Sequence, residues 1–288
     1  MRLLGAVIGD ISGSWYEFRG FKQRPAALVT QRDFFTDDSV LTLAVAEGMM
    51  NGFEQIDRTK LMQDESAQNA FRLEIVKSIC EFAHRYPDAG YGNTFLRWYV
   101  EAYERKVYQP YNSWGNGSAM RASFAGWAAQ SLEEALLFGQ LSAEVTHDHP
   151  EGVKGAQATA AAIFLARTAH DKAEIKAYVE REFGYDLSRS CDEIRPTYHH
   201  VESCQETVPQ AITAVLESRD FEDALRTAVS LGGDSDTLAA ITGSIAEAFY
   251  GVPEDLKQEC RKRLTPELAE ILRRWESALY NEKICGRI

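Results

Sequence analysis

The stretch "DSDTLAAITGSIAEAFYG" (residues 234–251) decides the fold class of this 288-residue chain. It follows two glycines suited to ending a preceding helix, and its alanine, glycine and serine residues recur at helical spacing. Small residues on a helix face let a neighbouring helix approach closely. The glycines of "GAVIGDISGSWYEF" (5–18) repeat every four residues and predict a second face of this kind. Both segments therefore favour a core of closely packed helices.

Helical periodicity continues along most of the chain. "SVLTLAVAEGMM" (39–50) has a broad apolar stripe typical of a largely buried helix. Strand signals are poor, and no long linker divides the chain. We therefore expect an all-α, single-domain bundle over residues 1–288, with 184–202 as an irregular excursion over its surface. Further helices are expected at 131–147, 171–183, 203–218, 220–233 and 265–280.

Three of these helices begin with the pattern of a capping box, in which a Ser, Thr or Asp precedes a Glu by three residues. The pairs are Ser131 with Glu134, Asp171 with Glu174, and Ser203 with Glu206.

Composition narrows the classes of partner. The chain carries 31 basic and 43 acidic residues, a net charge of −12, and has no local basic patch, so nucleic acid is not an expected partner. Its five cysteines are odd in number and contain no CxxC, which indicates reduced thiols. No signal-peptide layout and no membrane-length apolar run is present. We expect a cytoplasmic protein without a membrane partner.

Two similar acidic clusters precede helical runs. Thr36, Asp37 and Asp38 come just before the 39–50 segment, and "DSDT" (234–237) opens the last glycine-rich helix. The ordinary interpretation is that each cluster caps its helix. A cap needs one acceptor, however, and adjacent carboxylates repel each other unless a cation lies between them.

Together the clusters offer four carboxylates and two threonine hydroxyls. Oxygen ligands of this kind suit hard divalent cations such as Mg²⁺ and Mn²⁺, and the absence of Cys and His argues against zinc. Two ions could share such a site. The candidate ligands are Thr36, Asp37, Asp38, Asp234, Asp236 and Thr237.

A glycine-containing loop offers a ligand-binding candidate. In "NSWGNGSAMRASFAGW" (112–127), Gly115-Asn116-Gly117 leads into a helix expected to begin near Ser118, and glycines let backbone amides approach a ligand. Trp114 could stack on a base. The alternative is an ordinary glycine-rich turn beside a core tryptophan.

Two further segments carry polar groups that a site could use. In "THDHPEG" (146–152), His147 and His149 either begin a capped helix as polar loop residues or bind a ligand, and His147 could donate to a phosphate. In the first segment, Asp10 and Glu17 interrupt a buried-looking stretch. Each is either a satisfied core group or part of a site.

These segments, in this order, resemble the ADP-ribosylglycohydrolase family. The matching stretches are "GAVIGDISGSWYEF", "FFTDDSVLTLAVAEG", "GNGSAMR", "THDHPEG" and "LGGDSDTLAAITG". The combination of TDD with GGDSDT carries most of the resemblance, which spans residues 5–243. It implies an all-α orthogonal helical bundle with two Mg²⁺ or Mn²⁺ ions held by the candidate ligands named above.

The resemblance also implies a substrate site. His147 falls where the family contacts the pyrophosphate, and Tyr91 and Gly92 are candidates for the wall around the distal ribose. Glu17 matches an acidic position that is catalytic in some members, whereas others have the acid or base elsewhere. The ADP moiety is expected against Ser113, Trp114, Gly115, Asn116 and Gly117.

The expected activity is hydrolysis of the bond at C1″ of ADP-ribose, on a modified protein side chain or a small ester. Asp37 or Asp38 would orient the attacking water, with Glu17 as the candidate acid or base. We expect a monomer. One alternative is a non-catalytic interaction or immunity protein on the same fold, which usually loses metal carboxylates. Another is a helical phosphohydrolase, for which His147-Asp148 is the candidate His-Asp pair.

Overall fold

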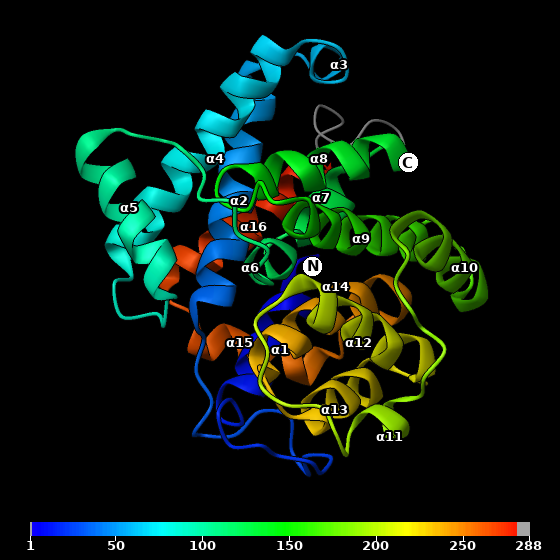
Figure 1. Ribbon diagram of the computed structural model, residues 1–288. Helices are drawn as coiled ribbons and strands as arrows, with labels where there is room; N and C mark the ends of the chain where they lie inside the picture. The colour runs from blue at the N-terminus through cyan, green and yellow to red at the C-terminus, as the bar shows by residue number, and fades with distance from the viewer. Residues whose placement is uncertain (1, 281–288) are drawn as a thin grey trace.

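The computed structural model describes residues 2–280, which form sixteen α-helices and no β-strand (Figure 1). The predicted all-α fold class is confirmed. The helices are α1 Leu4–Ser14, α2 Asp37–Gln55, α3 Arg58–Leu61, α4 Glu65–Arg85, α5 Asn93–Arg105, α6 Gly117–Met120, α7 Ser123–Ala128, α8 Leu132–Glu144, α9 Pro150–Arg167, α10 Lys172–Phe183, α11 Cys191–Ile194, α12 Cys204–Glu217, α13 Phe221–Leu231, α14 Ser235–Tyr250, α15 Glu254–Arg263 and α16 Pro266–Tyr280.

The two small-residue segments pack against each other at the centre of the molecule. Every residue of α1 is buried, and α1 runs antiparallel to α14 (Figure 1). A Cβ atom added at Gly9 would lie 2.0 Å from the carbonyl oxygen of Ala239, and one at Gly13 would lie 2.3 Å from that of Ser235. Only glycine permits this backbone approach. The end of α1 therefore lies beside the start of α14.

Helices from several parts of the chain pack directly on this pair, namely α2, α6, α7, α9, α12, α13 and α15. α2 packs on α4 and also reaches α1, α14 and α16, while α8 and α9 pack together beside α7 (Figure 1). The helices predicted from periodicity are all present. Among the described residues, no helix is long and apolar enough to cross a membrane.

Helix caps follow the sequence only in part. The box at Asp171 forms with both of its hydrogen bonds. Ser131 caps α8, but the Glu134 carboxylate pairs with Arg58. The prediction of a capping box at Ser203 is wrong, because the Ser203 hydroxyl donates to the Glu206 carboxylate and caps no backbone N–H.

The glycine-rich segment also departs from the prediction. The expected helix from near Ser118 is divided into α6 and α7, because Arg121 and Ala122 have ψ angles near 0° (4° and −1°). The first of these helices is a single turn. Among the cysteines, Cys80, Cys191, Cys204 and Cys260 are buried free thiols, as expected, and Cys285 lies outside the described residues.

A candidate metal and substrate site

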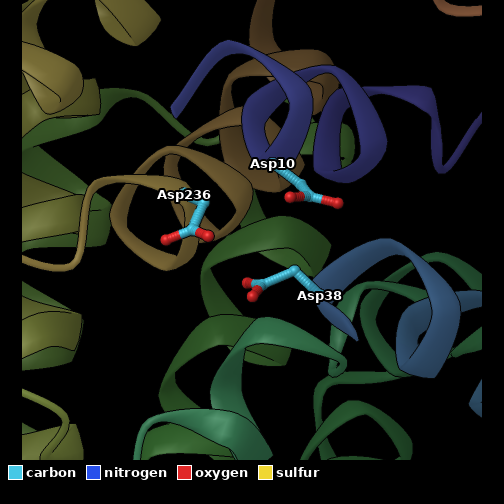
Figure 2. A group of neighbouring side chains, drawn as sticks. All are labelled: Asp10, Asp38 and Asp236. Carbon is cyan, nitrogen blue, oxygen red and sulfur yellow. The ribbon is translucent and has the colours of Figure 1, made fainter. Parts of the chain in front are cut away.

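Three helices bring carboxylates to one point in the core. Asp10 comes from α1, Asp38 from the first turn of α2, and Asp236 from the first turn of α14 (Figure 2). One carboxylate oxygen from each lies within 4.8 Å of the others, and all three side chains are buried. The two sequence clusters, although far apart along the chain, thus meet at α1.

A second group shares Asp236. It joins Asp236 to Asp234 and to Glu17, again with one oxygen of each within 4.8 Å of the others. Glu17 lies just after α1 and is half-buried, so it forms the more accessible edge of the cluster. The antiparallel packing of α1 and α14 explains this juxtaposition.

Asp10 organises the start of α2. Its carboxylate accepts hydrogen bonds from the Thr36 backbone N–H (2.9 Å), the Thr36 hydroxyl (2.8 Å) and the Ser39 backbone N–H (3.0 Å). The Ser39 hydroxyl donates to it as well. Asp10 was left between two interpretations by sequence reasoning. The structure makes it both a satisfied core group and a member of the acidic cluster.

The threonines of the two motifs serve the carboxylates. Thr36 caps α2 by accepting from the Asp38 backbone N–H (3.3 Å), so the ordinary capping interpretation holds for this side chain. The Thr237 hydroxyl donates to Asp38 Oδ2 (3.2 Å). Asp38 Oδ1 is buried and has no hydrogen-bond partner within the part of the chain that the structure describes. That oxygen is free to bind a further group.

Among the described residues, the strongest charge effects on the aspartates of the cluster come from other carboxylates. Burial raises the pKa values of Asp37, Asp38 and Asp236, and the charges that add most to the rise are other carboxylates. Burial likewise raises the pKa of Asp10 to about 6. A group of buried carboxylates that repel one another is stable only if protons or cations neutralise it. The donor set, all oxygen, fits a hard divalent cation.

Asp37 faces the turn before α5. Its backbone N–H donates to the Ala89 carbonyl (2.7 Å), and a Cβ added at Gly90 would lie 3.7 Å from Asp37 Oδ1. Tyr91 follows, buried and stacked on Phe95. Its hydroxyl has no partner among the described residues. The turn that carries the candidates Tyr91 and Gly92 therefore lies beside Asp37.

The glycine-rich loop reaches the same cluster through Asn116. The Asn116 side-chain amide donates to Asp234 Oδ2 (2.8 Å) and to the Thr207 hydroxyl (3.1 Å). The loop pairs with the chain before α12, where the Asn116 backbone N–H donates to the Glu202 carbonyl (2.7 Å). Ser113 accepts from the Gly115 backbone N–H (3.1 Å) and shapes the turn.

The histidines and the tryptophan divide between core and surface. His147 is buried beside Gly115 and Gly117, whereas His149 caps α9. Trp114 is 54% exposed, so it is not a core tryptophan, and its ring meets that of His149 edge-on at 5.7 Å. It is thus open to a planar ligand.

The His-Asp pair of the helical phosphohydrolase alternative lies elsewhere. Asp148 accepts from the Asn112 backbone N–H (2.7 Å), and His147 Nδ1 bonds the Thr146 hydroxyl. Neither side chain belongs to the carboxylate groups.

Lys22, which the sequence did not indicate as important, connects the segment that carries Glu17 to the rest of the molecule. The Lys22 ammonium donates to the backbone carbonyls of Tyr198 and Leu231. Leu231 is the last residue of α13, just before the turn to Asp234. No local pattern in the sequence indicates this contact, because Lys22 lies 176 and 209 residues away from its two partners along the chain.

Fold and site together define a helical protein with a buried acidic centre able to hold metal ions. The family model described as ADP-ribosylglycohydrolase matches residues 2–283, and the chain belongs to this family.

Relatives agree with this assignment. The chain is 29% identical over 319 residues to ADP-ribosylhydrolase ARH3 of Bos taurus, covering 90% of this chain and 87% of that protein. It is 34% identical over 148 residues to ADP-ribosylarginine hydrolase Tri1 of Pseudomonas putida (strain GB-1), covering 48% of this chain and 39% of that one. A solved structure described as an ADP-ribosylglycohydrolase-related protein complex has the same fold, with a TM-score of 0.69 and 20% identity over 94% of this chain and 95% of that one.

Proposed function

We propose that this protein hydrolyses the glycosidic bond at C1″ of ADP-ribose and releases ADP-ribose from a modified protein side chain or a small ester. The observation that carries the proposal is the pair of buried carboxylate groups that share Asp236. Asn116 of the glycine-rich loop donates to Asp234 of one group, and the turn at 90–92 lies beside Asp37. The family and the names of the relatives support ADP-ribose as the substrate.

Two divalent cations, Mg²⁺ or Mn²⁺, would be held by the two motifs. They would neutralise the carboxylates and polarise the oxygens of a substrate and of a water molecule. The unpartnered Asp38 Oδ1 and the all-oxygen donor set support this assignment. The proposed ligands are Thr36, Asp37, Asp38, Asp234, Asp236 and Thr237.

Glu17 is the proposed acid or base. It is half-buried at the edge of the cluster, and its pKa is raised to about 7, first by burial and then by the charge of Asp234. A carboxyl group of this kind can carry a proton near neutral pH and deliver it to a leaving group. Asp37 or Asp38 would orient the water.

The rest of the substrate would extend along the glycine-rich loop. Trp114 offers an exposed ring for a base, and Ser113, Gly115, Asn116 and Gly117 line the turn beneath. His147 would face the diphosphate, and Tyr91 with Gly92 the distal ribose. We further propose that the protein is one domain and acts as a cytoplasmic monomer.

Activity assays test this function directly. The protein is incubated with Mg²⁺ or Mn²⁺ and a panel carrying ADP-ribose on arginine, serine or acetate. We expect release from at least one member, and its loss in Asp37→Ala and Asp236→Ala. Asp64→Ala is the matched control, because Asp64 caps α4 through the Ser66 backbone N–H (2.8 Å), outside the cluster.

Two results would contradict the proposal. One is that no panel member is cleaved. The other is that cleavage persists in both cluster variants. Binding of an ADP-ribosylated protein without cleavage would favour the non-catalytic alternative.

A further inference from the structure

Arg121 places a positive charge inside the core without a carboxylate beside it. Its side chain is fully buried at the turn between α6 and α7. One terminal nitrogen, Nη2, donates to the Ser142 carbonyl (3.1 Å) and to the Thr146 hydroxyl. The other, Nη1, and Nε have no partner in the described part of the chain. Burial lowers the pKa of Arg121 to about 10, so it stays charged at neutral pH.

Thr146 connects this charge to His147. Arginine has only donors, so the Thr146 oxygen must accept from Arg121. The same hydroxyl lies 2.7 Å from His147 Nδ1. The hydroxyl keeps one proton to donate, and its neighbouring acceptors are His147 Nδ1 and the Tyr111 hydroxyl oxygen. An imidazole that accepts at Nδ1 and is neutral carries its hydrogen on Nε2.

The surroundings keep His147 neutral. Its pKa lies well below the ordinary value, first because the ring is buried and then because of the Arg121 charge. Tyr111 also contacts the ring, with 5.6 Å between ring centres, and is itself a neutral group at physiological pH because burial raises its pKa. The ring is therefore neutral, and a neutral ring that accepts at Nδ1 donates through Nε2.

Nε2 points at the glycine-rich loop. A Cβ atom added at Gly117 would lie 3.2 Å from Nε2, and one at Gly115 would lie 3.4 Å from it. Nε2 has no hydrogen-bond partner among the described residues. The two glycines thus leave His147 Nε2 uncovered, whereas a side chain at either position would contact it.

We propose that Arg121 and Thr146 are positioning residues that hold His147 as an Nε2–H donor for the anionic diphosphate of the substrate. The proposal rests on the function proposed above and adds how the donor is prepared. Arg121 does not touch the ligand in this arrangement. It acts through Thr146 on the tautomer of His147.

The tautomer is measured without ligand. Protein labelled with ¹⁵N-histidine is studied by long-range ¹H–¹⁵N correlation, with His147→Gln to assign the signal. We expect His147 to show a neutral ring protonated at Nε2 that does not titrate between about pH 5.5 and about pH 8. In Thr146→Val, which removes only the hydroxyl, we expect a mixture of tautomers. Thr146→Ser should restore the wild-type spectrum.

Binding supplies the second readout, with ADP-ribose as the titrant in calorimetry. Thr146→Val should weaken binding by about tenfold or more, and Thr146→Ser by much less. Thr213→Val is the matched control, because the Thr213 hydroxyl is also buried but donates to the Pro209 carbonyl (2.9 Å). It should bind as the wild type does. Arg121→Gln should weaken binding too, but it leaves a fully buried site unfilled, so Thr146→Val is the decisive variant.

A wild-type spectrum with the hydrogen on Nδ1 would contradict the proposed positioning of His147. Equal ADP-ribose affinity of Thr146→Val and the wild type would contradict it as well. Failure of the wild type to bind ADP-ribose would instead overturn the proposed function and the assignment of the diphosphate. The spectrum would still decide whether Arg121 and Thr146 set the tautomer.

Discussion

At the scale of single residues, the side chains at the start of α2 can either cap the helix or bind a metal ion. Thr36 does cap α2, as its position suggests. Asp38 does not, and instead accepts from Thr237 while its second oxygen remains unpartnered in the described residues. One residue of the motif therefore satisfies the helix, and the carboxylates remain for another purpose.

Asp236→Asn tests whether the carboxylates bind metal, because Asp236 belongs to both carboxylate groups. We expect Mg²⁺ affinity to fall at least about 100-fold in calorimetry, since a shared ligand is lost. In a chelator, the variant should be at least as stable as the wild type, because one repelling charge is gone.

Thermal unfolding with and without Mg²⁺ measures the second effect. Asp64→Asn, at an ordinary cap, is the control and should leave Mg²⁺ binding unchanged. Undiminished Mg²⁺ affinity in Asp236→Asn would show that the carboxylates do not form a metal site.

At the scale of elements, the α1–α14 contact places the chemistry. Because the helices are antiparallel, the end of α1 meets the start of α14, and a Cβ at Gly13 would lie 2.4 Å from the Asp236 Cα. The glycine spacing predicted a closely packed face on α1. It did not predict which helix would cover that face, because many helices in the chain carry small residues.

Gly9→Ala tests the tightness of this contact. The added methyl group would overlap the Ala239 carbonyl and force α1 and α14 apart, so we expect the free energy of unfolding to fall by about 3 kcal/mol. Urea denaturation measures this change. Gly92→Ala is the control: its φ is −62°, nothing lies within 4 Å of the added atom, and its stability should change by less than about 0.5 kcal/mol. Equal effects of the two substitutions would contradict the packing.

At the scale of the whole molecule, the acidic centre couples stability to pH and to metal. Without metal, the pKa values of Asp10, Glu17 and Asp37 are raised to about 6, 7 and 8, above the ordinary values of 3.8, 4.5 and 3.8. Between about pH 4.5 and about pH 8 these three groups hold more protons in the folded chain than in the unfolded chain. Their contribution to stability therefore falls as pH rises through this window.

We therefore expect the melting temperature in a chelator to decrease from about pH 5 to about pH 8. In saturating Mg²⁺ the decrease should be smaller or reversed, because metal binding favours ionised carboxylates. Thermal unfolding in both conditions measures the two profiles. Surface charge contributes equally to the two melting-temperature profiles, so the difference between them reports the acidic centre. Parallel profiles would contradict the coupling of this centre to metal binding.

The helical fold class could be predicted from the sequence, because helix periodicity and capping are local properties of neighbouring residues. The sequence also indicated the two acidic motifs, since adjacent carboxylates exceed what a cap requires. Tertiary structure decided what these motifs do together. Asp10 joins them only because α1 packs against α14 and α2, and Lys22 contacts segments 176 and 209 residues away along the chain. Such contacts depend on how helices pack, which short-range spacing does not encode.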